Sequence, residues 1–227
     1  MNYMTELHCH TAEVSQCAHM GIAETVRRYI AKGFDTLVLT EHFSTVTFDV
    51  MKDKSWQEKC DYFLSTYNEA LRDSDGKINI LLAMEFRNIY SNNDYLVYGV
   101  TEEFIRDNNT DDSHNLIGLH LKDFTELAHN YGMLVYQAHP FRNGMTVINP
   151  SYLDGIEICN GHRRHDSRND IAAMWAAKFG LLTCGGSDCH EEGDEASVAL
   201  VTDYEITDNA TLIKALKDKV NLVTPED

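Results

Sequence analysis

IAETVRRYIAKGFDTLVLTEH, residues 22–42, combines a helix, a turn and a buried strand in one short stretch. Apolar residues recur at helical spacing in its first half (Ile22, Val26 and Ile30), and the pattern stops before Gly33, as in a helix closed by a glycine. The second half contains the apolar run 36–40, which is typical of a strand buried on both faces. A helix that leads through a glycine into such a strand is a repeating unit of α/β proteins.

The same alternation continues along the chain. Further apolar runs predict strands at residues 4–8, 78–84, 95–100, 133–138, 155–158 and 181–185. Further stretches of helical spacing predict helices at residues 56–71, 119–130, 170–179 and 209–217. This alternation indicates parallel pairing with right-handed crossovers, so the seven strands fit either a closed barrel or an open doubly wound sheet. No G-x-G-x-x-G follows the first strand, which argues against a nucleotide-binding open sheet.

The composition is that of one globular domain. The 227 residues are 43% hydrophobic and 24% charged, enough for one substantial core, and no Pro- or Ser-rich linker divides them. We therefore expect a single domain over residues 1–227. No apolar run approaches the roughly 20 residues of a membrane span, and residues 1–10 lack the features of a signal peptide. We expect a cytoplasmic protein with no membrane partner.

The charge balance is acidic. Lys and Arg number 19 against 36 Asp and Glu, and the formal net charge of −17 argues against nucleic acid as a partner, because such a surface repels polyanions. The same carboxylates, together with 11 His residues, suit divalent cations. The six Cys residues form no C-x-x-C pair, which argues against a zinc ribbon or a disulfide framework.

Ionisable residues gather at the ends of the expected strands. They are His8, His10, Glu41, His42, Glu85, His139, Asp188 and His190. In a parallel barrel the C-terminal ends of all strands lie on one rim, so we expect these side chains to converge there. Residues at i and i+2 of an extended segment share a face, so both histidines of the segment 8–10 can reach one cation. The intervening Cys9 and, by the same argument, Cys189 then point into the barrel wall as small apolar residues.

The order of these motifs resembles the PHP domain, the polymerase and histidinol phosphatase family of metal-dependent phosphoesterases. The matching segments run in family order across nearly the whole chain: HCHT (8–11), LTEH (39–42), AME (83–85), AHPFR (138–142) and GSDCH (186–190). The resemblance implies a distorted, TIM-like (β/α)7 barrel with parallel strands and outer helices. This agrees with the number of strands expected from the apolar runs.

The resemblance also implies a trinuclear site of two to three divalent ions (Zn, Mn or Fe) at the barrel mouth. Carried over by position, the ligands are His8, His10, Glu85 and Asp188 for the first metal, Glu85 and His139 for the second, and His42 and His190 for the third. Among these we expect Glu85, Asp188 and His190 to be catalytic.

Two ligand positions remain open in this comparison. The family supplies a further ligand shortly after the first motif, and here both Glu13 and His19 qualify, with Glu13 preferred because it is nearer the strand end. The family also places a His before the strand at 95–100, where this chain has Asp94. A carboxylate there favours harder metals than an imidazole does.

The implied reaction is the hydrolysis of a small phosphate monoester, as in histidinol phosphatases, by a metal-activated hydroxide. The partner is then a small phosphorylated substrate, which cationic or polar side chains must bind. The candidates are Arg142, Arg87, Arg163 and Asn160. Arg142 is preferred because its fork suits phosphate and it follows a ligand motif. Arg87 and Arg163 could equally form surface ion pairs, and Asn160 could cap a turn.

Two other functions fit part of the pattern. An amidohydrolase also opens with H-x-H and closes with a strand-end Asp, but it needs a bridging Lys or Glu at strand four and a His at strand six, which here ends in Cys159 and Asn160. A PHP domain that binds metal without turnover, as a regulatory partner, is the second alternative, and the near-complete ligand set argues against it.

Overall fold

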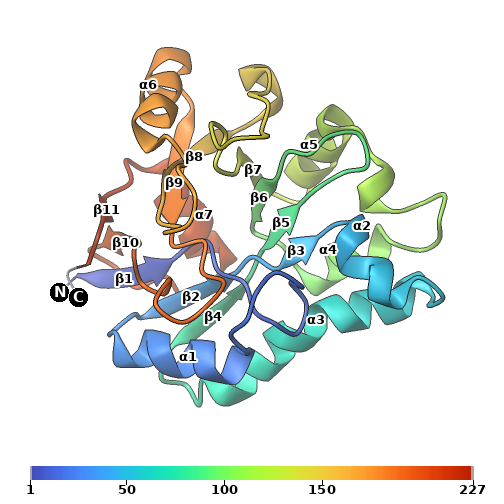
Figure 1. Ribbon diagram of the computed structural model, residues 1–227, viewed down its shortest axis with the longest axis horizontal. Coiled ribbons are helices and arrows are strands. Elements are labelled where there is room, and N and C mark those ends of the chain that lie inside the picture. The colour runs from blue at the N-terminus through green and yellow to red at the C-terminus, as the bar shows by residue number, and fades with distance from the viewer. Residues whose placement is uncertain (1, 226–227) are drawn as a thin grey trace.

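Two mixed sheets form the centre of the part of the chain that the computed structural model describes, residues 2–225 (Figure 1). One sheet has the order β11-β10-β1-β2-β4, with β11 (Leu222–Val223), β10 (Ala199–Thr202), β1 (Tyr3–Glu6), β2 (Thr36–Leu39) and β4 (Asn79–Leu82). The other has the order β3-β5-β6-β7-β8-β9, with β3 (His42–Phe43), β5 (Met84–Phe86), β6 (Tyr95–Tyr98), β7 (Leu134–Gln137), β8 (Gly155–Asn160) and β9 (Leu182–Gly186). All seven strands expected from the apolar runs are present.

The two sheets are joined by two bent segments. Only Ala83 separates β4 from β5, and residues 40–41 separate β2 from β3. Both halves pair in the same way, since β2 lies parallel to β4 and β3 lies parallel to β5. At these bends the chain passes from one sheet into the other. Residues 41–42 and 85 therefore lie side by side, with His42 paired to Glu85.

The prediction that all strands are parallel is wrong for part of the chain. Strand β6 is antiparallel to both of its neighbours, β5 and β7, and β10 is antiparallel to β1 and β11. The pairs β1–β2, β2–β4, β3–β5, β7–β8 and β8–β9 are parallel as predicted. Because β5 and β7 both oppose β6, the N-terminal end of β6 lies beside the C-terminal ends of β5 and β7.

A closed (β/α)7 barrel is not present within residues 2–225. Between the end of β1 and the end of β9 there is a single parallel bridge, formed by Cys9 and Cys189. The backbone N–H of His10 donates to Cys189 O at 3.0 Å, and that of Cys189 donates to His8 O at 3.4 Å. The fold is therefore mixed α/β, with an open arrangement that approaches closure only at the edge where the ionisable residues lie.

Helices cover the outer faces of the sheets. They are α1 (Ile22–Ala31), α2 (Thr45–Phe48), α3 (Trp56–Asp73), α4 (Glu102–Asp107), α5 (Leu121–Asn130), α6 (Asn169–Phe179) and α7 (Asn209–Lys217), with 3-10 turns at Asp49–Met51, Leu116–Gly118 and Pro150–Tyr152. Their ends follow local chemistry: a capping box between Ser55 and Glu58 starts α3, and Gly180 in the left-handed region (φ 64°) ends α6. Within residues 2–225, no helix combines the length and the apolar character that crossing a bilayer would require.

Candidate metal centre

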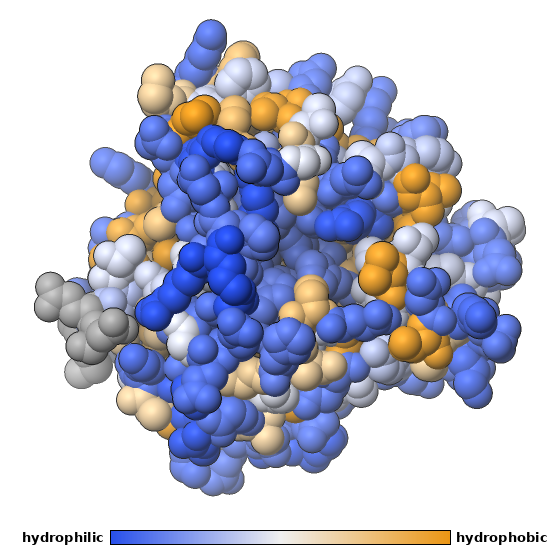
Figure 2. All heavy atoms as spheres, viewed as in Figure 1, coloured by the Kyte–Doolittle hydropathy of each residue, from blue (hydrophilic) through white to orange (hydrophobic). Residues whose placement is uncertain are grey.

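The bridge between Cys9 and Cys189 sets the two ligand segments 8–10 and 188–190 side by side. Both cysteine side chains are fully buried and pack in an apolar cluster with residues such as Ile22 and Leu37, as predicted. Because side chains alternate along an extended segment, the flanking residues of both segments turn to the opposite side. The face that contains this edge is hollowed near its centre, and hydrophilic side chains surround the hollow (Figure 2).

A first group of ligand atoms comes from His8, His10, Glu85 and Asp188, all buried. His8 Nε2 lies 3.1 Å from His10 Nε2, 3.3 Å from Asp188 Oδ1 and 3.5 Å from Glu85 Oε1. His10 Nε2 lies 3.3 Å from Glu85 Oε2 and 3.4 Å from Asp188 Oδ1. A tetrahedral site with bonds of about 2.0–2.1 Å has ligand atoms about 3.3–3.4 Å apart. The spacing of these atoms therefore fits a metal such as zinc.

A second group consists of Glu85, Asp94 and His139. His139 Nε2 lies 3.0 Å from Glu85 Oε1 and 4.0 Å from Asp94 Oδ2. The Nδ1 atom of His139 is buried and is one of the few buried polar side-chain atoms within residues 2–225 that have no partner. Asp94 precedes its strand, and it reaches this group because β6 is antiparallel to its neighbours. The group brings together the residues expected at the second metal.

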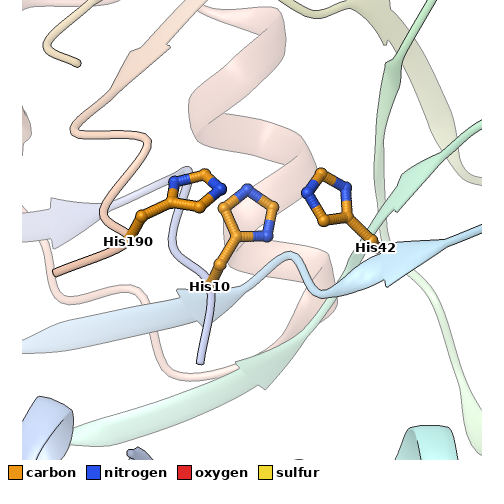
Figure 3. Close-up of side chains that lie close together, drawn as sticks. All are labelled: His10, His42 and His190. Carbon is orange, nitrogen blue, oxygen red and sulfur yellow. The ribbon is translucent and has the colours of Figure 1, made fainter. Parts of the chain in front are cut away.

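A third group consists of His10, His42 and His190, whose rings converge from three different elements (Figure 3). The ring of His10 lies between the other two, with centroids 4.3 Å from His42 and 4.5 Å from His190. His190 Nδ1 is 2.8 Å from Asp188 O, which leaves its Nε2 available as a ligand. His42 Nδ1 is 2.8 Å from Glu85 Oε2, so one carboxylate connects all three groups.

The loop that follows β1 does not bring Glu13 or His19 into these groups. Both carboxylate oxygens of Glu13 accept from the backbone N–H of Ile22, at 3.0 and 3.1 Å, and so cap the first turn of α1. A Cβ at Gly21 would lie 2.8 Å from Glu13 Oε1, so a larger residue there would make this carboxylate shift. His19 is exposed and belongs to none of the three groups. Cys17 of this loop does reach the third group, since its Sγ lies 3.3 Å from His42 Nε2.

Glu157 on β8 accepts hydrogen bonds from residues of the candidate metal centre, and none of the sequence motifs contains it. Its Oε1 lies 2.8 Å from His8 Nδ1, and its Oε2 accepts from the backbone N–H of His139 at 2.8 Å and from Asn160 Nδ2 at 3.0 Å. A carboxylate on one ring nitrogen fixes the tautomer of a histidine and directs the other nitrogen to a metal. An acidic residue inside an apolar strand is the sequence signal that could have identified it.

Ser15 and Glu41 form a hydrogen-bond network next to His10 and His42 of the third group. Ser15 Oγ donates to Glu41 Oε2 at 2.6 Å, accepts from the backbone N–H of His42 at 3.0 Å and lies 3.3 Å from His10 Nδ1. Glu41 also accepts from the backbone N–H of Thr11 at 3.1 Å and from its hydroxyl. Although these hydrogen bonds act to lower it, burial raises the pKa of Glu41 to about 7.

Mutual charge interactions shape the ionisation of the centre. Burial lowers the pKa of His8, but the carboxylates of Asp188, Glu157 and Glu85 outweigh it and raise that pKa well above its ordinary value. Burial raises the pKa of Asp188, and His8 with its neighbours brings it well below the usual range. His10 differs, because burial and the nearby His42 and His190 hold its pKa well below the ordinary value. A neutral imidazole is the form that binds a metal.

Two ligand residues have strained backbones. His139 has φ 28° and Asp188 has φ 52°, values in the left-handed region that residues with a Cβ rarely adopt. Each such conformation costs on the order of 1–3 kcal/mol, and such strain persists where the surroundings enforce it. Here the hydrogen bonds of Glu157 to His139 N and of Arg142 to Asp188 provide that enforcement.

Arg142 and Asn160 form one network around Asp188. Arg142 Nη2 donates to Asp188 Oδ2 at 2.6 Å and to Asn160 Oδ1 at 2.9 Å, and the guanidinium also contacts Ser167. The amide nitrogen of Asn160 donates to Glu157 Oε2 and to Asp188 Oδ2 at 3.1 Å. The amide nitrogen of Asn160 is therefore used within the protein, in contact with Glu157 and Asp188.

Arg87 lies beside the second and third groups. Its Nε and Nη2 donate to the two oxygens of Asp94 at 2.6 and 2.7 Å, a bidentate pair that fixes the guanidinium plane. Arg87 also lines a cavity of about 340 Å³, together with Gln16, Cys17, His42, Ser44, Val46 and Thr47. Arg163 is exposed in the loop after β8. A larger cavity of about 620 Å³ extends along β4, and none of the candidate ligand residues lines it.

The arrangement fits bound divalent metal ions. The ligand atoms have the spacing of a coordination shell, and the donors are imidazoles and carboxylates. The residues expected at all three metals from the sequence are brought together, apart from Glu13 and His19.

Comparisons with solved structures agree on the fold. PsfC from Pseudomonas syringae PB-5123 matches with a TM-score of 0.70 at 14% identity, covering 99% of this chain and 92% of that chain. A protein from Bifidobacterium adolescentis ATCC 15703, described as a metal-dependent phosphoesterase, matches with 0.56 at 14%, covering 92% and 94%. Endonuclease Q in complex with a 27-mer duplex that carries an abasic lesion matches with 0.67 at 15%, covering 96% and 57%.

Comparison with protein families is more specific. No curated protein matches the sequence significantly. Residues 6–182 match the PHP domain, and residues 166–220 match the family described as PHP-associated. The first match spans more than half of the chain and contains all the ligand residues before β9. The chain therefore belongs to the PHP domain family of metal-dependent phosphoesterases.

Proposed function

We propose that the protein hydrolyses a small phosphate monoester. The observation that carries this proposal is the cavity of about 340 Å³, whose wall contains both His42 of the metal centre and the guanidinium of Arg87. Its volume lies near the lower end of the roughly 300–1,000 Å³ of small-molecule sites. A cation fixed beside a metal centre suits a compact dianion such as a phosphoryl group.

Bound divalent ions supply Lewis acidity and a water of lowered pKa. The chain itself provides their ligands and orients the substrate. Glu85, Asp188 and His190 act as ligands, with Glu85 shared among the three groups. Asp94 holds the plane of Arg87 so that the guanidinium meets the phosphoryl oxygens in a fixed orientation, and Arg142 holds Asp188. Fixed charges of this kind favour a transition state in which charge grows on those oxygens.

The net charge of −17 argues against nucleic acid as a substrate, but the fold does not. The structure of endonuclease Q with a DNA duplex has the same fold over most of this chain, so the fold itself is compatible with DNA as a substrate. The small volume of the cavity at Arg87 favours a monoester over a polymer. Histidinol phosphate is one such monoester, and the cavity walls do not single it out.

A substrate panel tests the proposal. Metal-stripped protein is supplied with Zn, Mn or Fe(II) and offered p-nitrophenyl phosphate, p-nitroacetanilide and a duplex with one abasic site. The proposal expects metal-dependent release of p-nitrophenol and neither of the other products. Cleavage of the anilide alone would support the amidohydrolase alternative, cleavage of the duplex alone would support a nuclease, and metal binding without turnover of any substrate would support a regulatory domain. Each of these three results would contradict the proposal.

A further inference from the structure

A thiol that the histidine motifs do not predict lies beside the third ligand group. Cys17 Sγ lies 3.3 Å from His42 Nε2, and the same thiol is in hydrogen-bonding contact with His190. The other ring nitrogen of His42 faces Glu85 Oε2 at 2.8 Å. A carboxylate on Nδ1 with Nε2 directed forward is the arrangement found in metal-binding histidines, so the thiol lies beside the nitrogen that would face the third metal.

The backbone of the loop fixes this placement. The N–H of Ser15 donates to Thr11 O at 3.0 Å, and that of Ala18 donates to Ser15 O at 2.8 Å, so the chain turns tightly around Cys17. The N–H of His19 donates to His190 O at 2.6 Å, which attaches the loop directly to a ligand residue. The loop thus places the exposed Cys17 beside His42, whereas the exposed His19 belongs to none of the three groups.

We propose that Cys17 is the thiolate ligand of the metal that His42 and His190 hold, in the position where the sequence offers Glu13 or His19. This inference rests on the proposed function in that both concern the same metal centre. With a zinc–sulfur bond of about 2.3 Å and a zinc–nitrogen bond of about 2.0–2.1 Å, tetrahedral ligands lie about 3.6 Å apart. The 3.3 Å between Cys17 Sγ and His42 Nε2 is close to this value.

The ligand chemistry then differs between sites. A thiolate with two imidazoles is a soft set and selects a borderline-soft cation such as Zn²⁺ over Mn²⁺. The first group has two carboxylates, from Glu85 and Asp188, and accepts harder ions as well. Binding of the metal displaces the thiol proton to solvent, so that Cys17 binds as its anion. The proposal therefore predicts a mixed centre in which only the third ion is bound through sulfur.

Cobalt substitution tests the ligand directly, because Co²⁺ replaces Zn²⁺ and thiolate ligation adds a sulfur-to-cobalt charge-transfer band in the near ultraviolet. The metal-stripped full-length protein is titrated with Co²⁺ as wild type and as Cys17→Ser, Cys17→Asp and Cys159→Ser. Cys159 is a half-buried thiol in β8 with no ligand role, so it serves as the matched control. Circular dichroism reports folding, and hydrolysis of p-nitrophenyl phosphate is measured in parallel.

The proposal expects the band in the wild type and in Cys159→Ser, and its loss in both Cys17 variants. Cys17→Ser should bind its last equivalent of metal about 100-fold or more weakly, since even outer-shell changes cost about 10- to 100-fold. Cys17→Asp should recover that equivalent without the band. A wild-type cobalt protein that lacks the band, or a band that survives in Cys17→Ser, would overturn the proposal. A wild type with the band but without hydrolysis would contradict the proposed function and support the thiolate ligand.

Discussion

The Nδ1 atom of His8 lies 2.8 Å from Oε1 of Glu157, and both side chains are fully buried. This contact leaves Nε2 of His8 as the nitrogen that faces His10, Glu85 and Asp188. The other oxygen of Glu157 accepts from the backbone N–H of His139, so a single carboxylate orients ligands at the ends of β1 and β7. The orientation of these two candidate ligands therefore depends on a residue that lies outside the three ligand groups.

Replacing Glu157 should weaken metal binding without removing a ligand. In Glu157→Gln only one of the two side-chain oxygens remains as an acceptor, and the charge that favours the His8 tautomer is lost, so we expect the affinity for Zn²⁺ to fall about 10- to 100-fold. Calorimetric titration of the metal-stripped protein measures this. Glu126→Gln, on the exposed face of α5, is the matched control. Equal affinities in the two variants would show that Glu157 does not position His8.

Arg87 should contribute to substrate binding more than to folding. Arg87→Met keeps the aliphatic bulk but removes the guanidinium from the cavity wall and from Asp94. A hydrogen bond to a charged group contributes about 1.5–3 kcal/mol, so kcat/KM for p-nitrophenyl phosphate should fall roughly 10- to 150-fold. Steady-state kinetics with Arg27→Met, an exposed arginine of α1, provides the comparison. An unchanged kcat/KM would assign Arg87 to structure alone.

The metal-free protein should become less stable as the pH rises through Glu41. Burial raises the pKa of this carboxyl from its ordinary 4.5 to about 7, so between these values the folded state holds a proton that the unfolded state has lost. Stability therefore falls as the pH rises across this window. Glu41→Gln keeps a hydrogen-bond acceptor for Thr11 and Ser15 but cannot ionise.

Urea unfolding at about pH 5 and about pH 7.5 measures the effect. The free energy of unfolding of Glu41→Gln, taken relative to that of the wild type, should be a few kcal/mol higher at about pH 7.5 than at about pH 5. Glu85 and Asp188, whose pKa values are lowered, lose their stabilising charge only at more acidic pH, and they are common to both proteins. If the free energies of unfolding of the two proteins differ by the same amount at both pH values, the pKa of Glu41 is not raised.

The apolar runs predict the strands well because each is long enough to be buried and is bounded by polar residues. Their direction is less predictable, and β6 illustrates why. The connection between β5 and β6 comprises only residues 87–94, and a parallel crossover needs about a dozen residues or more. The short connection therefore forces an antiparallel pair. Strands β10 and β11 are absent from the prediction; β11 has only two residues and lies at the sheet edge, whereas β10 lies between β11 and β1.

The ligands on strand ends are predictable for a related reason. Motifs such as 8–10 and 188–190 place two side chains on one face through local geometry alone. Asp94 is harder to place, since it precedes its strand and would lie on the wrong rim of an all-parallel barrel. Cys17 cannot be chosen from the sequence, because the loop offers three candidate ligands and long-range contacts with Ile22 and His190 decide between them.

Replacing Asp188 with Asn tests most directly the claim that the converging ligands form one catalytic metal centre. The change removes the charge of a residue whose Oδ1 lies 3.3–3.4 Å from two histidine nitrogens, while the side chain keeps its shape. The exposed Asp166→Asn in the loop after β8 is the control. Bound metal by elemental analysis and hydrolysis of p-nitrophenyl phosphate should fall together in Asp188→Asn and stay at wild-type levels in Asp166→Asn. An Asp188→Asn protein with full metal content and full activity would contradict the account.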